Sequence, residues 1–389
     1  MTVVDFKRLV VRTYTLHFLL KVKGILSKYS PTLFVWLTNK EITMSSSDNR
    51  IIQYDILRIV AALAVVWLHT SAQRFYICYP SVEWDARNFY DSLVRWAVPI
   101  FVMISGALFL DSRKKIDVKN IYTKNITRVV LIFFFWSIVY ALYDGIGEKD
   151  YIGLVRSIVQ GPFHFWFLKM LIGLYIIVPL LKVIVVDKKL ERYYICLSLV
   201  TAFIIPMLFP FIGYFSDGAR DFVEKYYDGF GVKIALGYVG YFVLGNYLAN
   251  NRIKDTHKIV IYILGILSVF VVCVLTYLVS SHIGAPTVFF YGNLNVFTLF
   301  EAVALFILIK DVKIAPKYHA FFISVSKISL GIYIIHPFVM NVLFDYGNID
   351  STSLNPIFFI PLFAIIVFII SYCVSFVLIR IPIIKKFLM

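Results

Sequence analysis

Tyr54-Asp55-Ile-Leu-Arg58-Ile-Val-Ala-Ala-Leu-Ala-Val-Val-Trp-Leu-His69 is an apolar run that carries a carboxylate, a guanidinium and an imidazole. At about 100° per residue, a helix places Arg58 and His69 on nearly the same face, about 16 Å apart along its axis. Asp55 lies beside that face. Ionisable groups within a membrane span face the interior of a bundle or a wet cavity, so this stripe is the first hypothesis for a functional site.

The composition indicates a polytopic membrane protein. Of 389 residues, 60% are hydrophobic and 16% are charged, and the mean hydropathy is +0.82; a soluble fold of this length buries less apolar surface. The net charge of +15 comes from short Lys and Arg clusters between apolar runs, so we expect no nucleic-acid partner. The four cysteines are scattered, and we expect neither a metal site nor a disulfide framework.

Ten apolar segments have the length of a membrane span. The loops between them alternate in charge: residues 111–128 are rich in Lys and Arg, whereas residues 281–292 are nearly free of both. The positive-inside rule then predicts that both termini are cytosolic, in an all-α integral membrane bundle of about ten transmembrane helices. The expected spans are residues 56–74, 92–110, 127–143, 163–181, 193–213, 232–250, 258–280, 290–309, 320–343 and 357–380.

The first 50 residues differ from the rest. They carry eight Lys or Arg among short apolar stretches and never reach the roughly 20 clean residues that a span needs. Met44 opens a Met-Ser-Ser-Ser-Asp stretch typical of the start of a chain. We therefore expect a basic N-terminal extension over residues 1–50, with Met44 as an alternative start, and a polytopic membrane domain over residues 51–389.

The expected topology sorts the polar residues by depth. Glu301 falls near the middle of its span. The other candidates fall into an inner set and an outer set, which together form a polarised pathway if the helices pack accordingly. The inner set is Arg58, Lys124 and Arg128, and the outer set is His69, Arg95, His164 and His336.

Several motifs between residues 50 and 380 occur in the order of a known family. They are Arg58 to His69 with ten residues between them, Arg95-Trp-Ala-Val-Pro-Ile-Phe-Val-Met-Ile-Ser-Gly106, Phe165-Trp-Phe-Leu168, Leu174-Tyr-Ile-Ile-Val-Pro179, Gly240-Tyr-Phe-Val-Leu-Gly245 and Ser329-Leu-Gly-Ile-Tyr-Ile-Ile-His-Pro337. This pattern resembles the acyltransferase-3 family of integral membrane O-acyltransferases. Members of that family move acyl groups, commonly acetyl from acetyl-CoA, onto hydroxyls of surface polysaccharides, lipid-linked sugars, peptidoglycan or antibiotics.

The resemblance implies that His69 is the catalytic histidine and Arg58 its functional partner. An imidazole suits either general-base catalysis or acyl transfer through the ring, and both alternatives remain open. Many members have two arginines near the start of the third span, where this chain has Lys124 and Arg128. A lysine cannot make the bidentate contact with phosphate that an arginine makes.

We therefore expect a membrane O-acyltransferase that takes acetyl, or a related short acyl group, from cytosolic acyl-CoA to a carbohydrate hydroxyl. Its expected location is the cell membrane, in a bacterium the plasma membrane. Arg128 and Lys124 are the candidates for binding the donor phosphates. The candidates for acceptor binding are Arg95, His164, Trp166, Glu301 and His336.

Structural alternatives exist for each of these residues. Arginines near a helix end snorkel to the interface, basic loops act as topology signals, and His164 with Trp166 fits an interfacial aromatic belt. The rival function is a transporter or exporter of polysaccharide or lipid-linked sugar, in which the buried charges line a path without acyl transfer. A membrane sensor is a third reading. Dependence on CoA separates both rivals from the enzyme.

Overall fold

The computed structural model describes an all-helical chain, which confirms the predicted class. The described part contains no strand. The chain divides into two compact units: the main unit, Ile52–Ile132 with Trp166–Met389, and the small unit, Met1–Ile51 with Phe133–Phe165. The described residues are 50–115, 117–145, 150–214, 218, 232–347 and 355–385. The expected extension, including Met44, lies outside them, apart from residue 50.

The helices of the main unit are α2 (Ile52–Ala72), α3 (Val82–Leu93), α4 (Ala97–Phe109), α5 (Val118–Asn120), the π-helix η1 (Ile121–Ile126), the first part of α6 (Thr127–Asp144), α8 (Trp166–Val186), α9 (Lys188–Ser198), the π-helix η3 (Leu199–Ile204), α10 (Ile205–Gly213), α12 (Val232–Asn250), α13 (Asp255–Ile283), η6 (Phe289–Tyr291), α14 (Val296–Lys310), η7 (Pro316–Tyr318), α15 (His319–Lys327), α16 (Ser329–Gly347), α17 (Pro356–Leu378) and α18 (Pro382–Lys385). The small unit contains the rest of α6, α7 (Tyr151–Gln160) and η2 (Phe163–Phe165).

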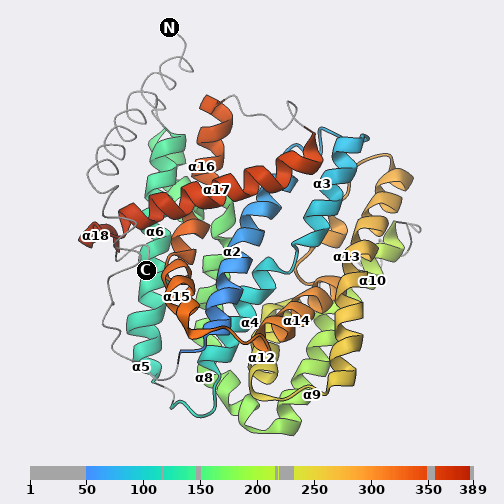
Figure 1. The fold of residues 1–389 in the computed structure, drawn as a ribbon, viewed down its shortest axis with the longest axis vertical. Coiled ribbons are helices and arrows are strands. Elements are labelled where there is room, and N and C mark those ends of the chain that lie inside the picture. Colours follow the sequence, from blue (N-terminus) through green and yellow to red (C-terminus); the bar gives the residue numbers. More distant parts are fainter. Residues whose placement is uncertain are drawn as a thin grey trace. The chain divides into compact units, whose positions relative to one another are not determined.

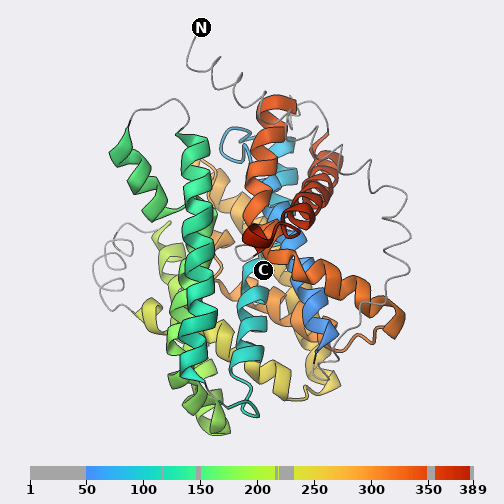
Figure 2. The same cartoon turned by 90° about the vertical axis from the view of Figure 1, so that its left-hand side faces the viewer.

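Helix α2, which carries the stretch quoted first, is central to the main unit. It packs against α3, α4, α14, α15, α16 and α17 (Figure 1). Two of these neighbours, α16 and α17, also pack against each other and lie side by side in Figure 2. Helix α2 carries Arg58 and His69 itself and contacts the helices that carry Glu301 and His336, which are α14 and α16.

The end of α2 is stabilised by Arg87 on α3. Its side chain is fully buried, and one nitrogen, Nη1, donates to the carbonyls of Thr70, Ser71 and Gln73 at 3.3, 3.4 and 2.6 Å. The last carbonyls of a helix have no intrahelical partner and carry its negative dipole end, which a cation stabilises. Glu83, four residues before Arg87, completes the pairing at 2.7 Å.

Two glycines allow α4 and α12 to approach closely. A Cβ added at Gly106 would lie 1.8 Å from the carbonyl oxygen of Phe242, and one added at Gly245 would lie 2.1 Å from the carbonyl oxygen of Met103. Small residues let helices in membranes pack backbone against backbone. Two of the motifs quoted above, Arg95 to Gly106 and Gly240 to Gly245, therefore meet at this seam.

The predicted number of spans is supported in part. The described residues contain eight helices, single or joined, that are long and apolar enough to cross a membrane. A ninth is counted if Pro316–Lys327 and Ser329–Phe344, which are bent by 53°, form one span. Residues 232–250, predicted as a further span, form α12 but are not among these. The count of ten and the cytosolic termini remain predictions.

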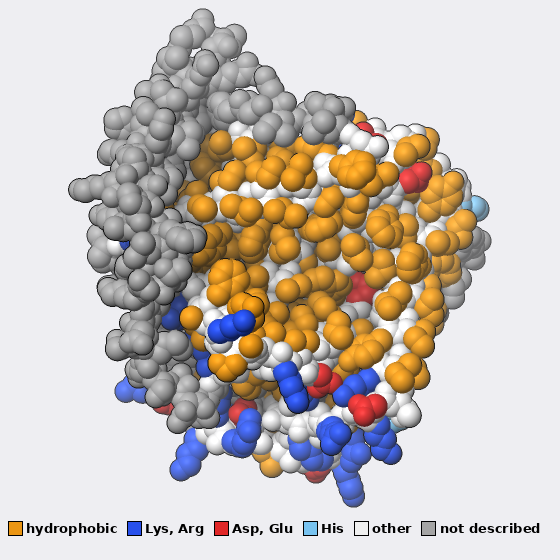
Figure 3. Space-filling model, viewed as in Figure 1, with side chains coloured by type: hydrophobic (Ala, Val, Ile, Leu, Met, Phe, Trp, Pro, Cys, Tyr) orange, Lys and Arg blue, Asp and Glu red, His pale blue; other side chains and the backbone are white. Residues whose placement is uncertain are grey.

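The segments with Lys and Arg beside α5, α8, α9 and the start of α13 lie toward the same end of the main unit in Figure 1, which we call the basic end, whereas α18 lies away from it. Lys182 on α8 donates to the carbonyls of Asp111 and Lys114. Likewise Lys258 at the start of α13 forms an ion pair of 2.7 Å with Asp311, at the end of α14. Figure 3 shows Lys and Arg gathered along the lower edge of one face, below a broad apolar surface.

Candidate functional site

The first polar group of α2 lies near the basic end. Asp55 is 1% exposed, and its Oδ1 accepts hydrogen bonds from the Ser326 hydroxyl at 2.7 Å and from Arg58 Nη1 at 3.3 Å. A buried carboxylate requires such partners. The Arg58 side chain is 29% exposed, so its guanidinium is held on one side and accessible on the other.

Tyr175 on α8 brings Arg58 close to the third span. Its buried hydroxyl interacts electrostatically with both Arg58 and Arg128 and is hydrogen-bonded to Ser105. The two arginines predicted to lie in the inner half therefore share a neighbour. Lys124 lies in the π-helix Ile121–Ile126 and is exposed. Asp111, whose carbonyl accepts a hydrogen bond from Lys182 at the basic end, lies outside the spans. Hydrogen bonds from Arg113 hold the pKa of its carboxyl group below the usual value.

His69 and His336 form a stacked pair at the other end of α2. Their ring centroids are 5.1 Å apart, and the ring planes differ by 29°. His336 is fully buried, whereas His69 is half-buried. Nδ1 of His336 lies 2.8 Å from the carbonyl oxygen of Tyr333. A carbonyl only accepts, so Nδ1 carries the proton, and Nε2 is the basic nitrogen of the neutral ring.

Arg95 lies at the junction of α3 and α4 and contacts several groups of this cluster. It forms an ion pair with the buried Asp91, donates to the carbonyl of Tyr291 at 3.1 Å, and places its guanidinium 4.1 Å from the Tyr291 ring centroid. It also interacts electrostatically with His69 and with Glu301. An arginine so fixed supplies positive charge inside the bundle without the cost of ordering it during binding.

Glu301 on α14 has a buried carboxyl group that is 4% exposed. Neither of its oxygens has a hydrogen-bond partner among the described residues. Leaving a buried polar group unsatisfied costs free energy, so the site suits a hydrogen-bond donor supplied by a ligand or water. Glu301 interacts electrostatically with Arg95 and forms no hydrogen bond with it.

A stripe of side chains on α4 connects the two ends of the cluster. Phe101, Ser105 and Phe109 are four residues apart and therefore share one helix face, which spans about 12 Å. The Phe109 ring is 4.5 Å from the ring of Tyr175. The Phe101 ring is 5.9 Å from that of Phe167, which is itself 5.6 Å from Tyr333, the residue hydrogen-bonded to His336.

The structure thus brings four of the predicted residues together from separate elements: His69, His336, Arg95 and Glu301. It places Trp166 against Tyr238, with ring centroids 5.6 Å apart.

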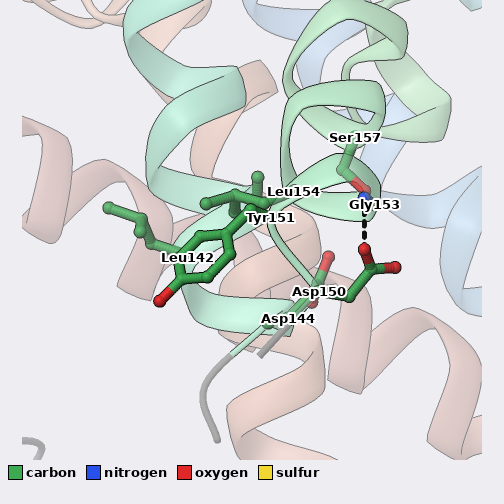
Figure 4. A pocket seen from close by; sticks show the side chains of 9 residues that line it. Leu142, Asp144, Asp150, Tyr151, Gly153, Leu154 and Ser157 are labelled. Atoms are coloured by element: carbon green, nitrogen blue, oxygen red, sulfur yellow. Dashed lines mark hydrogen bonds between the residues drawn. The ribbon is translucent and has the colours of Figure 1, made fainter. Parts of the chain in front are cut away.

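His164 belongs to the small unit, Met1–Ile51 with Phe133–Phe165. Its buried ring contacts Tyr140 edge-on, with a centroid distance of 5.4 Å. Figure 4 shows a pocket elsewhere in this unit, lined by residues of α6 and α7 that include Asp144, Asp150 and Ser157. The hydrogen bond drawn there, from Gly153 N to Asp150 Oδ1 at 2.9 Å, caps α7. The pocket contains no sequence-predicted site residue.

Three residues of the cluster were not predicted from the sequence: Asp91, Tyr175 and Tyr291. Asp91 could have been found, because it precedes Arg95 by four residues and lies on the same helical face. Tyr175 lies within the quoted motif from Leu174 to Pro179, which indicated no role for its hydroxyl, and Tyr291 carried no local signal among the 26 tyrosines of the chain. In the described part of the chain, no group of three His, Cys, Asp or Glu side chains is arranged to hold a metal ion.

The comparison with family models gives the class of the protein, a membrane acyltransferase. The model of the acyltransferase-3 family, described as an acyltransferase domain, matches residues 51–380, and the chain belongs to that family. Neither the curated proteins nor the solved structures contain a match.

Proposed function

We propose that this membrane acyltransferase transfers acetyl, or a related short acyl group, from cytosolic acyl-CoA to a hydroxyl of a cell-surface carbohydrate, and that His69 is its catalytic histidine. The observation that carries the proposal is the half-buried imidazole of His69, located on the same helix as Arg58 and within electrostatic range of Arg95. An imidazole with access to a ligand and a fixed cation nearby is suited to general-base catalysis.

The reaction needs one proton acceptor and one cation. His69 removes the proton of the acceptor hydroxyl as its oxygen attacks the thioester carbonyl. The carbon–sulfur bond then breaks, the acyl group remains on the new ester, and the CoA sulfur leaves with the proton that the imidazolium returns. If the imidazole instead carries the acyl group, its basic nitrogen first displaces the CoA thiolate from the thioester carbonyl. The acceptor hydroxyl then attacks the acyl-imidazole, which releases neutral imidazole, and the hydroxyl proton goes to the thiolate.

The donor is proposed to bind from the basic end. Arg58 and Arg128 both interact with Tyr175 there, and Lys124 is exposed nearby in sequence. Arginine and lysine make charge-assisted hydrogen bonds with phosphates. Because Arg58 and His69 are about 16 Å apart along α2, only an extended arm spans the interval, as the pantetheine arm of CoA does. The stripe of Phe101, Ser105 and Phe109, about 12 Å long, offers a largely apolar wall along part of this interval.

The acceptor is proposed to bind at the opposite end of the cluster. Glu301 offers two buried acceptor oxygens for sugar hydroxyls, and Arg95 offers a cation. Trp166 presents an exposed indole, which suits stacking against a sugar ring. The role that the sequence predicts for His164, in the small unit, stays a prediction. A carbohydrate acceptor at the surface of a bacterial plasma membrane fits this polar, aromatic set of groups.

The test is CoA-dependent turnover by the purified protein in lipid nanodiscs. We expect acetyl-CoA to be consumed with release of CoA, faster in the presence of oligosaccharide acceptors. His69→Ala should lower the rate by about 10²–10⁴-fold, the usual contribution of a general base. His257→Ala, at an exposed histidine of α13, is the matched control. Binding of oligosaccharide with no consumption of acetyl-CoA would instead support the transporter.

A further inference from the structure

The stacked pair of histidines contains a feature that depends on the residue after His336. Pro337 lies inside α16. In an α-helix the N–H of residue 337 would donate to the carbonyl of residue 333, but proline has no N–H. The Tyr333 carbonyl therefore receives no bond from that position of the helix. Nδ1–H of His336 donates to the same carbonyl at 2.8 Å, in place of the missing backbone donor.

This replacement fixes the chemical form of the His336 ring. The bond to Tyr333 keeps the proton on Nδ1, so Nε2 is the only basic nitrogen of the neutral imidazole. It also fixes the ring orientation, because Nδ1 lies 3.3 Å from a second carbonyl, that of Ile332. A ring held in this way presents a constant surface to His69, with which it stacks at 5.1 Å.

We propose that His336 is a positioning residue for His69, and that Pro337 holds His336 in one tautomer by leaving the Tyr333 carbonyl to its Nδ1–H. This proposal rests on the proposed function, because it assigns a partner to the catalytic histidine. Two imidazolium ions this close repel each other, so the pair takes up one proton at a time. His336 stays neutral and oriented while His69 receives the proton of the acceptor.

The charged groups around the two histidines are compatible with a neutral His336 and a His69 that accepts the proton. Arg95 adds positive charge on the side of His69, and Glu301 interacts with Arg95. Helix α17, which packs against α16, contains no Asp, Glu, Lys, Arg or His. On α15 the nearest charge in sequence is Lys327, and it is exposed.

The test is a double-mutant cycle between His336 and Pro337, measured as release of CoA from acetyl-CoA. His336→Ala should lower kcat by about 10–100-fold, as the loss of an orienting partner does, and should leave KM within about threefold. Pro337→Ala restores a backbone donor to Tyr333 and should lower kcat without removing either imidazole. Because Pro337 acts through His336, the double variant should match His336→Ala alone.

The chain offers a matched control in α8. Gly173-Leu-Tyr-Ile-Ile-Val-Pro179 is similar to Gly331-Ile-Tyr-Ile-Ile-His-Pro337, with Leu174 in place of Ile332 and Val178 in place of the histidine. Pro179→Ala therefore makes the same backbone change without a histidine to affect, and its effect should multiply with that of His336→Ala. His336→Phe keeps a ring and loses the donor, so Pro337→Ala should have no further effect in that background even if the alanine variant folds poorly.

Each outcome decides the matter. If the wild-type protein turns over and His336→Ala has the same kcat, the positioning role of His336 is wrong and the proposed function stands. Effects of His336→Ala and Pro337→Ala that multiply would show that the proline acts on the helix and not on the tautomer. A shift of the kcat–pH profile in Pro337→Ala, absent in Pro179→Ala, would support the proposal. Absence of turnover by the wild-type protein would overturn the proposed function and this inference with it.

Discussion

Replacing Gly106 by alanine tests the seam between α4 and α12. The added Cβ would lie 1.8 Å from the carbonyl oxygen of Phe242, a backbone atom that no side-chain rotation can move away. Ordinary contact begins near 3.4 Å, so the helices must separate by roughly 1.5 Å, and in a close-packed interior such overpacking costs about 1–3 kcal/mol or more. Because α4 also carries Ser105 and Phe101, the displacement should reach the site.

We expect Gly106→Ala to lower both the midpoint of thermal unfolding and the rate of CoA release in nanodiscs. The matched control is Gly173→Ala on α8, where an added Cβ meets no heavy atom within 4 Å. That change should be neutral or stabilise by up to about 1 kcal/mol, since glycine is a poor residue in a helix interior. If Gly106→Ala unfolds at the same temperature as the wild type, the two backbones do not approach as closely as described.

Other predictions concern the pathway from donor to acceptor. Arg128→Ala should raise KM for acetyl-CoA more than KM for the acceptor, because it removes a phosphate contact present throughout the reaction; a change confined to the acceptor constant would contradict a donor site at the basic end. Arg95→Ala should raise KM for the acceptor more than KM for acetyl-CoA in the same assay. An increase in KM for acetyl-CoA alone would show that Arg95 does not bind the acceptor. Asp55→Asn removes the charge that Arg58 faces and should lower acyl transfer while keeping the hydrogen bond from Ser326, whereas Ser326→Ala should have the smaller effect; equal losses would indicate a purely structural role for Asp55. Deleting residues 1–43 should preserve membrane level and activity if Met44 is the start, and a variant that inserts but is inactive would show that the extension belongs to the enzyme.

The spans could be predicted because their information is local. A run of apolar residues with a 3.6-residue period places Arg58 and His69 on one helix before any packing is known. The second span was predicted as residues 92–110, but its helix begins earlier, at Val82, and breaks between α3 and α4. The sequence obscured this start, because α3 is rich in polar residues.

These polar residues are buried by pairing with one another or with distant backbone groups. Arg87 donates to the end of α2, and Asn88 donates to the carbonyl of Cys273 at 2.9 Å. A hydropathy average is lowered by each such polar residue, and it contains no information on the hydrogen-bond partner that makes burial of the residue favourable. The same reason explains why the stack of His69 on His336 was not foreseen: it depends on how α2 and α16 pack, and no local pattern carries that information.

The stacked histidines also constrain the biogenesis of the protein. His336 is synthesised about 270 residues after His69, which at 5–20 residues per second takes roughly a quarter of a minute to a minute. During that interval α2 has neither His336 nor Ser326 as a partner. The ion pair between Asp55 and Arg58 does not depend on later segments. Both residues lie within α2, so they pair as soon as this helix forms. This pairing inside one helix lowers the charge that the nascent segment must carry into the lipid while it waits for the rest of the bundle.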